Sequence, residues 1–198
     1  MSTYFDTLQI TYNDVPITEN GIATVEFMSA TEGVVALFDL FGTAAFGVVQ
    51  NDMNGNIAKI RARLLETGPE KSGTLELLVQ NEGKPGDKKR TATEGLLWLL
   101  RGLEFTSKAL RRSLDNPSEE LSVSFTKAYE DSLRKYHSMM VRPIFSLAMK
   151  ACPYRKDFYA KLGAPQDRVN AQLEEWVTSL ERIVRELQQF YEYVPATR

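Results

Sequence analysis

Hydrophobic residues recur at helical spacing along most of the chain, and no stretch shows the alternation typical of a β-strand. The first helical pattern covers about residues 19–40. The second covers about residues 46–67 and ends at Gly68 and Pro69, a strong helix-breaking pair. Residues 74–80 predict a shorter helix. Since the sequence shows neither an internal repeat nor a linker, it predicts one all-α domain over residues 1–198, with about eight helices.

The middle of the chain predicts two further helices separated by polar segments. Residues 82–90 are charged and rich in glycine and lysine, so we expect a solvated loop there. Thr91 or Thr93 could cap the leucine-rich helix that follows, because a threonine hydroxyl accepts from the free N–H groups of a first turn. Pro117 and the acidic residues after it predict the start of another helix, which continues toward His137.

Prolines and a glycine divide the last third of the chain. Pro143 starts or kinks a helix that Pro153 closes, and residues 155–162 form a short helix ended by Gly163. The final segment, from about residue 169 to residue 191, carries one continuous apolar face. We therefore expect its helix to run the length of the molecule.

The helix over residues 46–67 carries a polar column beside its apolar face. Asp52, Asn56 and Lys59 are separated by four and three residues, so they form a column about two turns, or ~10 Å, long at the edge of the core. A carboxylate accepts hydrogen bonds, a carboxamide donates and accepts, and an ammonium donates. Such a set could bind a hydroxyl-rich ligand such as a sugar, although the same spacing is typical of the solvated flank of an amphipathic helix.

Two other side chains could take part in binding. Trp98 lies near Gly102, which permits close approach of another group. A tryptophan in a leucine-rich helix usually belongs to the core, but an indole can also stack against the apolar face of a pyranose. His137, the single histidine, could be a general base, an amide-binding group or a structural residue. No nucleophile motif accompanies it, so the sequence does not favour an enzyme.

Composition excludes several classes of function. The 24 basic and 26 acidic residues leave no broad positive surface for nucleic acid. Cys152 and His137 are the only cysteine and histidine, which excludes an intrachain disulfide and any metal site that needs two histidines or a cluster of cysteines, and we expect no cofactor. The sequence begins without a signal-peptide pattern and contains no apolar run long enough to span a membrane. We expect a cytoplasmic protein that contacts membranes only peripherally.

Three segments together resemble the glycolipid transfer protein family. They are residues 52–59, residues 97–103, and residues 135–137 followed by 143–145 and 151–154, and the match extends in order and spacing over about residues 22–194. The resemblance implies a two-layer helical sandwich that holds a glycosphingolipid, with the sugar at a surface site and the ceramide chains in a collapsible apolar tunnel. It also implies a monomeric, non-enzymatic carrier between membranes.

The resemblance assigns roles to particular residues. Asp52, Asn56 and Lys59 would bind sugar hydroxyls, Asp52 would also reach the ceramide amide nitrogen, Trp98 would stack under the first sugar, and His137 would bind the amide carbonyl. The apolar residues expected to line the lipid tunnel are Phe38, Phe46, Val49, Leu103, Phe145, Leu147, Tyr193 and Val194.

Alternatives remain at the level of the ligand. Related ceramide-1-phosphate carriers have lysine in place of Asn56 and arginines in place of Trp98 and Gly102. Cations suit a phosphate, whereas an aromatic plate and a carboxamide suit a neutral sugar, so the resemblance favours the glycolipid branch. A ceramide-1-phosphate-type carrier and a lipid sensor that uses the same pocket remain alternatives. Met139, where well-known animal members have tryptophan, is the expected membrane contact.

Overall fold

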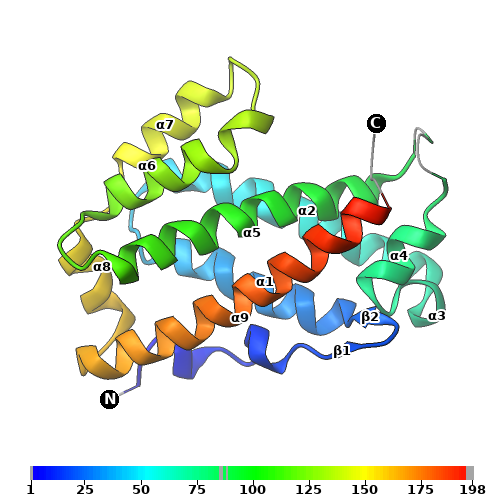
Figure 1. Ribbon diagram of the computed structural model, residues 1–198, viewed down its shortest axis with the longest axis horizontal. Helices are drawn as coiled ribbons and strands as arrows, with labels where there is room; N and C mark the ends of the chain where they lie inside the picture. Colours follow the sequence, from blue (N-terminus) through cyan, green and yellow to red (C-terminus); the bar gives the residue numbers. More distant parts are fainter. Residues whose placement is uncertain (1, 85–86, 88, 195–198) are drawn as a thin grey trace.

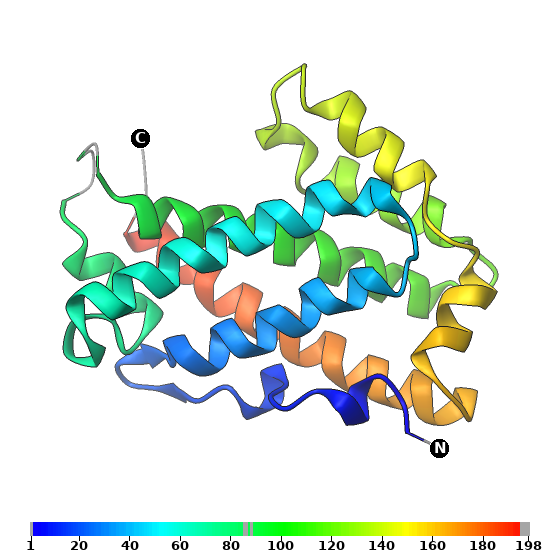
Figure 2. The same cartoon turned by 180° about the vertical axis from the view of Figure 1, so that it is seen from behind.

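The computed structural model describes residues 2–84, 87 and 89–194, and within them helices from distant parts of the chain face one another in two layers (Figures 1 and 2). Helices α1 (Thr24–Asp39) and α2 (Gly47–Thr67) form one layer, while α5 (Thr91–Asp115) and α9 (Gln166–Tyr193) form the other. The predicted all-α sandwich is confirmed. Positions 85, 86 and 88 of the predicted loop, and the tail after residue 194, lie outside the described residues.

Shorter elements close the two ends of this sandwich. The remaining helices are α3 (Pro69–Ser72), α4 (Leu75–Asn81), α6 (Leu121–Asp131), α7 (Arg142–Lys150) and α8 (Arg155–Leu162). In the part of the chain that the structure describes, four single 3-10 turns accompany them: η1 (Phe5–Thr7), η2 (Tyr12–Asp14), η3 (Ala44–Phe46) and η4 (Arg134–Tyr136). Predicted boundaries near Pro143, Pro153 and Gly163 agree with α7 and α8. The extra helix α3 begins at the predicted breaker Pro69, which is a favourable first helical residue.

The predicted start of the first helix at residue 19 is wrong, because the chain first makes a small hairpin. Strands β1 (Ile17–Thr18) and β2 (Gly21–Ile22) pair antiparallel, with Ile17 opposite Ile22. Gly21 has a φ of 112°, which an L side chain rarely adopts, and the Ile22 N–H donates to the Glu76 carboxylate at 2.7 Å. A long-range contact thus delays the helix until Thr24.

The capping prediction for α5 is also wrong. Neither Thr91 nor Thr93 caps this helix; both lie inside its first turn. The Glu82 carboxylate instead accepts from the backbone N–H of Ala92 at 2.8 Å and from that of Thr93 at 2.6 Å. A carboxylate stabilises the free N–H groups and the positive end of a helix more strongly than a hydroxyl does.

The helix expected to open at Pro117 begins later and ends sooner than predicted. Its first acid, Glu119, is not in the first turn but forms an ion pair with Arg112 at 2.7 Å and accepts from the Ser124 hydroxyl at 2.7 Å. Consequently α6 starts at Leu121. It stops at Asp131, and a 3-10 turn follows before His137, so the predicted continuation of the helix to that histidine is wrong.

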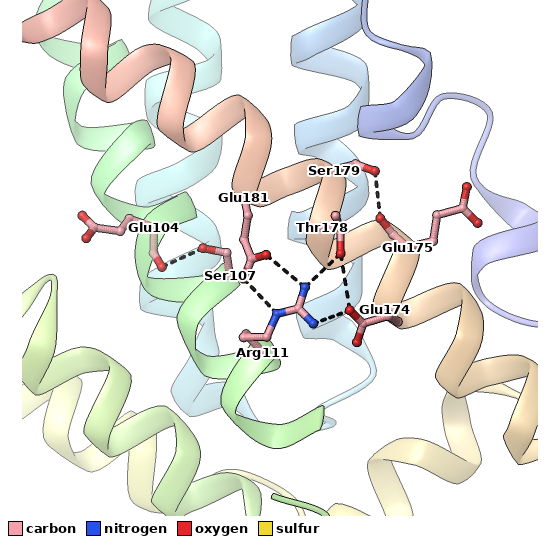
Figure 3. A network of polar contacts seen from close by, with 8 residues as sticks. All are labelled: Glu104, Ser107, Arg111, Glu174, Glu175, Thr178, Ser179 and Glu181. Carbon is pink, nitrogen blue, oxygen red and sulfur yellow. Dashed lines mark hydrogen bonds and ion pairs between the residues drawn. The ribbon is translucent and has the colours of Figure 1, made fainter. Parts of the chain in front are cut away.

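A polar network joins the C-terminal part of α5 to α9 (Figure 3). The Arg111 guanidinium donates to both carboxylate oxygens of Glu181, at 3.0 and 2.9 Å, and to the Thr178 hydroxyl at 2.9 Å, and it also pairs with Glu174. Hydrogen bonds to Glu181 are the largest cause of the raised pKa of Arg111. This two-pronged contact sets the register of α5, the helix that carries Trp98, on its neighbour.

Aromatic side chains fill the core where the sequence predicted a lipid tunnel. Phe38 stacks on Phe46 with ring centroids 5.3 Å apart, and Phe41 lies edge-on to Phe46 at 4.5 Å. Phe125 from α6 completes this group, with ring contacts to all three. These residues are buried. Acyl chains could enter here only if the rings move apart, because packed interiors leave little free volume.

Candidate headgroup site

The polar column on α2 forms at the edge of the core, as its spacing predicts. Asn56 is only 2% exposed, whereas Asp52 and Lys59 are exposed on either side of it. The Lys59 ammonium donates to the Asn56 amide oxygen at 3.0 Å, and the Asn56 amide nitrogen lies 3.4 Å from the Asp52 carboxylate. The three side chains therefore form one chain of donors and acceptors, held in place by the buried amide.

Trp98 and His137 come together although 38 residues separate them. Their rings are nearly parallel, with an interplanar angle of 20° and centroids 6.0 Å apart. His137 also contacts Phe145, at a centroid distance of 4.3 Å, and the Tyr129 hydroxyl, 3.1 Å from its Nδ1. Trp98 is half-buried on α5, so its indole is part of the core boundary and also reaches the surface.

All five predicted headgroup residues line the same surface cavity. Its volume is about 360 Å³, and its polar wall comes from Asp52, Asn56, Lys59 and His137. Its remaining lining residues are Val48, Trp98, Val141 and Phe145. The cavity thus combines groups that can hydrogen-bond hydroxyl and amide groups with an apolar side that continues into the core through Phe145, which is buried.

The electrostatics of this cavity follow from partial burial. Loss of hydration raises the pKa of Asp52 above its ordinary value, and the nearby Lys59 charge offsets part of that effect. Burial lowers the pKa of His137, and the positive charges of Arg142 and Arg101 lower it further. A neutral imidazole at pH 7 has one N–H to donate and one nitrogen that accepts. Both groups can hydrogen-bond a neutral lipid headgroup.

Two residues beside Trp98 were missed by the sequence analysis. The Arg101 guanidinium lies 4.6 Å from the Trp98 ring centroid and 3.8 Å from that of Tyr136. Arg101 follows Trp98 by three residues on α5, a spacing that could have indicated the contact. Tyr136 lies in η4 and gives no local signal of its position. The Arg101 guanidinium thus contacts both the Trp98 and the Tyr136 rings.

The close helix approach occurs at Gly95, not at Gly102 as predicted. A Cβ atom at Gly95 would lie 3.0 Å from Cδ of Lys59, whereas the nearest side-chain atom to one at Gly102 is 4.0 Å away, in Met53. The Lys59 side chain therefore packs against α5 at Gly95, and its ammonium donates to Asn56. The observed contact lies seven residues, or about two helical turns, before the predicted one, since helix crossing points depend on packing.

The residues predicted to line the lipid tunnel fall into two groups. Phe38, Phe46, Val49, Leu103 and Phe145 are buried. Leu147 is 67% exposed and Tyr193 is 84% exposed, so in this structure neither lines the interior, while Val194 is partly buried against the core. Leu147 points away because α7 turns Phe145, Ala148 and Met149 inward. Met139, the predicted membrane contact, is 83% exposed.

Comparisons with known proteins agree with this architecture. The family model described as glycolipid transfer protein matches residues 22–164. A glycolipid transfer protein of Aureobasidium melanogenum is 54% identical over 188 residues, covering 95% of this chain and 92% of that protein. A glycolipid transfer protein of Xenopus tropicalis is 36% identical over 167 residues, covering 80% of this chain and 79% of that protein.

Solved structures show the same relationship. The crystal structure of HET-C2, a fungal glycolipid transfer protein, has a TM-score of 0.90 and 46% identity, covering 96% of this chain and 97% of that chain. A structure that addresses how FAPP2 selects simple glycosphingolipids using the same fold has a TM-score of 0.85 and 28% identity, covering 97% and 96%. The fold defines a class of all-helical lipid-transfer proteins. The chain belongs to the glycolipid transfer protein family.

Proposed function

We propose that this chain takes a glycosphingolipid from one membrane and delivers it to another, as a single domain acting as a monomer. The observation that carries the proposal is the shared cavity of Asp52, Asn56, Lys59, Trp98 and His137, which opens beside an apolar core. Relatives across most of the chain's length are glycolipid transfer proteins. No bond in the lipid breaks in this process.

The proposed roles follow from the donor and acceptor groups in the cavity. Asp52, Asn56 and Lys59 hydrogen-bond the hydroxyls of the first sugar, and the Asp52 carboxylate also accepts from the ceramide amide N–H. Trp98 presents its apolar ring to the sugar. His137 donates to the amide carbonyl through Nε2, because its Nδ1 faces the Tyr129 hydroxyl.

The energetic need for a carrier comes from the hydrocarbon chains. Each methylene exposed to water costs ~0.8 kcal/mol, so moving the two long chains of a ceramide through water costs roughly 20 kcal/mol. An apolar interior removes most of that barrier. The stacked rings of Phe38 and Phe46 are the side chains that such a ligand would separate.

The neutral headgroup is favoured over a phosphate by the residues at two positions. Asn56 is buried and supplies an uncharged amide, and Trp98 supplies a ring rather than a cation. We expect the double variant Asn56→Lys and Trp98→Arg to lose most glycosylceramide transfer, since both changes replace hydroxyl-binding groups by cations. Vesicle assays with glucosylceramide and ceramide-1-phosphate measure this directly. Unchanged glucosylceramide transfer would contradict the assignment.

Transient contact with a membrane is proposed for the segment before α7. Met139 and Met140 are exposed, and the neighbouring α7 exposes Ile144 and Leu147. Arg134 and Lys135 lie close in sequence and suit anionic headgroups. Among the described residues, no helix is long and apolar enough to cross a bilayer. This patch would instead insert at the interface while the lipid moves.

A charge at the centre of this patch tests the membrane contact. Met139→Glu should reduce both sedimentation with vesicles and the transfer rate, because a carboxylate resists entry into the bilayer interface. Val25→Glu is a matched control, since Val25 is also exposed but lies on α1. Normal sedimentation and transfer by Met139→Glu would place the membrane contact elsewhere.

The central experiment is transfer of fluorescent galactosylceramide between donor and acceptor vesicles. Phosphatidylcholine and ceramide-1-phosphate serve as control lipids, and Asp52→Val removes the proposed acceptor for the headgroup. We expect selective transfer of the glycolipid that the variant abolishes while its helical circular dichroism is retained. Stoichiometric binding without transfer would indicate a lipid sensor. Equal transfer of ceramide-1-phosphate would overturn the headgroup assignment.

A further inference from the structure

The guanidinium of Arg101 lies against aromatic rings from two different elements. It is 4.6 Å from the ring centroid of Trp98 on α5 and 3.8 Å from that of Tyr136 in η4. Both distances are inside the ~6 Å over which a cation and a ring face attract each other. Tyr136 precedes His137 in the chain, and the His137 ring stacks on Trp98. These four side chains therefore form a closed circuit that joins α5 to the end of η4.

Arg101 has no acidic partner that offsets the cost of its partial burial. Arg111 and Arg112 on the same helix form ion pairs with glutamates, but within the described part of the chain no carboxylate forms an ion pair with Arg101. Burial is the largest cause of the lowered pKa of this guanidinium. A cation loses free energy when it loses hydration, and contact with aromatic faces offsets part of that loss. The two rings are therefore the groups that stabilise the cation here.

Arg101 does not line the headgroup cavity. Trp98 and His137 line that cavity, whereas Arg101 and Tyr136 line another surface cavity of about 350 Å³. Among the described residues, none lines both cavities. A headgroup in the first cavity thus meets the Trp98 and His137 rings, and Arg101 can act on it through the indole that it contacts.

The shape of the Arg101 side chain suits this contact better than its charge alone. A guanidinium is planar and stacks on aromatic faces, whereas a lysine ammonium is a compact and strongly hydrated point charge. Trp98 is only half-buried, so the core does not enclose its ring on every side. An indole that is already fixed loses less conformational freedom when a ligand binds to it.

We propose that Arg101 is a positioning residue for the headgroup site: its guanidinium stacks on the Trp98 and Tyr136 rings and fixes the indole in the orientation that receives the sugar. This inference rests on the proposed function, because it takes Trp98 as the ring that faces the sugar. Arg101 itself makes no contact with the lipid. The circuit keeps Trp98 in register with His137 before the lipid arrives.

The mobility of the indole tests this inference without any lipid. Trp176→Phe removes the other tryptophan, so that fluorescence anisotropy decay reports on Trp98 alone. In this background Arg101→Lys and Arg101→Met should both increase the fast motion of the indole, because neither new side chain is a planar cation. Lys108→Met is the matched control, since it removes an exposed cation on the same helix whose partner is Glu104. Unchanged anisotropy decay in both Arg101 variants overturns the inference.

The affinity for a soluble short-chain glucosylceramide, measured by calorimetric titration, tests the consequence for binding. We expect the Kd to rise roughly tenfold in Arg101→Lys and in Arg101→Met and to stay the same in Lys108→Met. Circular dichroism and urea unfolding of each variant separate this effect from a loss of the fold. Wild-type affinity of Arg101→Lys overturns the inference, because a positive charge would then be sufficient.

Variants of Tyr136 test the circuit from its other member, which is 38% exposed and tolerates truncation more easily than a core residue. Tyr136→Phe keeps the ring face and should bind as the wild type does. Tyr136→Ala should weaken binding, and its combination with Arg101→Met should weaken binding by less than the two separate losses together. Fully additive losses overturn the inference. Absence of glucosylceramide binding by the wild type contradicts the proposed function instead, and the anisotropy of Trp98 without lipid still decides whether Arg101 positions it.

Discussion

At the scale of single residues, Asn56 connects the polar groups of the headgroup site. It is buried between an exposed carboxylate and an exposed ammonium, accepts from Lys59 and lies within 3.4 Å of Asp52. A buried amide with partners on both sides fixes the geometry of its neighbours, because leaving it unsatisfied costs free energy. Local spacing predicted this arrangement, since all three residues lie on one helix.

Acidification should weaken glycolipid binding through Asp52. Its pKa is raised above 3.8 by partial burial, so the carboxylate becomes protonated at a higher pH than an ordinary aspartate. Protonation removes an ionic acceptor for the ceramide amide N–H. We expect the affinity for glucosylceramide in vesicles to fall as the pH decreases toward this pKa. A titration of binding from pH 7.5 to pH 4 measures the effect.

The contribution of Asp52 to the stability of the fold should increase on acidification, whereas its contribution to glycolipid affinity should decrease. A raised carboxyl pKa means that the folded chain binds the proton more tightly than the unfolded chain, so protonation of Asp52 stabilises the fold as the pH falls through that range. The control for the binding titration is Asp52→Asn, which cannot titrate at this position. If this variant loses affinity for glucosylceramide on acidification as much as the wild type does, protonation of Asp52 is not the cause of that loss.

At the scale of elements, the start of α5 depends on a residue outside the helix. Glu82 accepts from the backbone N–H groups of Ala92 and Thr93, ten and eleven residues later. The same helix is joined to α9 by Arg111 near its other end (Figure 3). These two contacts hold the helix that carries Trp98 at both ends of its length.

Removing the Glu82 carboxylate should destabilise the fold. Glu82→Ala leaves two N–H groups of the first turn without their acceptor, and loss of a helix cap costs about 1 kcal/mol. Urea unfolding of the variant and the wild type measures the free energy of unfolding. Glu130→Ala, an exposed glutamate on α6, is the control and should change it by less than ~0.5 kcal/mol. Equal stability of both variants would show that water replaces the cap.

At the scale of the whole molecule, the aromatic core decides what a bound lipid must do. Rings from α1, η3 and α6 are packed together in the place that acyl chains would occupy. The sandwich can admit a lipid only by moving its layers or rotating these rings. On binding, contacts between the rings are therefore replaced by contacts with hydrocarbon. A lipid that binds only the folded chain raises the free energy of unfolding, and the rise is larger when the Kd is lower.

Glycolipid binding should raise the thermal midpoint of unfolding. At a free ligand concentration 100 times the Kd the gain is about 2.7 kcal/mol, and 1 kcal/mol shifts the midpoint of a chain of this size by about 2–4 °C, so we expect a rise of roughly 5–10 °C. Differential scanning calorimetry with a short-chain glucosylceramide measures it. Asp52→Val should show a much smaller rise. An equal rise with phosphatidylcholine would contradict headgroup-specific binding.

The sequence by itself determined the helical class and the polar column on α2, because both follow from a period of 3.6 residues within one segment. It also indicated α8 and most of α9, where proline, glycine and a long apolar face act locally. The motifs that resemble the family joined Asp52, Trp98 and His137 in one predicted site, which spacing alone could not do.

Only the tertiary structure decided the features that depend on distant partners. Glu76 delays α1 by binding the backbone at Ile22, Glu82 replaces the predicted threonine caps, and the packing of α7 leaves Leu147 outside. The stacking of Trp98 on His137 likewise depends on how helices pack. Local periodicity specifies which face of a helix is apolar, whereas the groups that meet that face are specified by the packing of the whole chain.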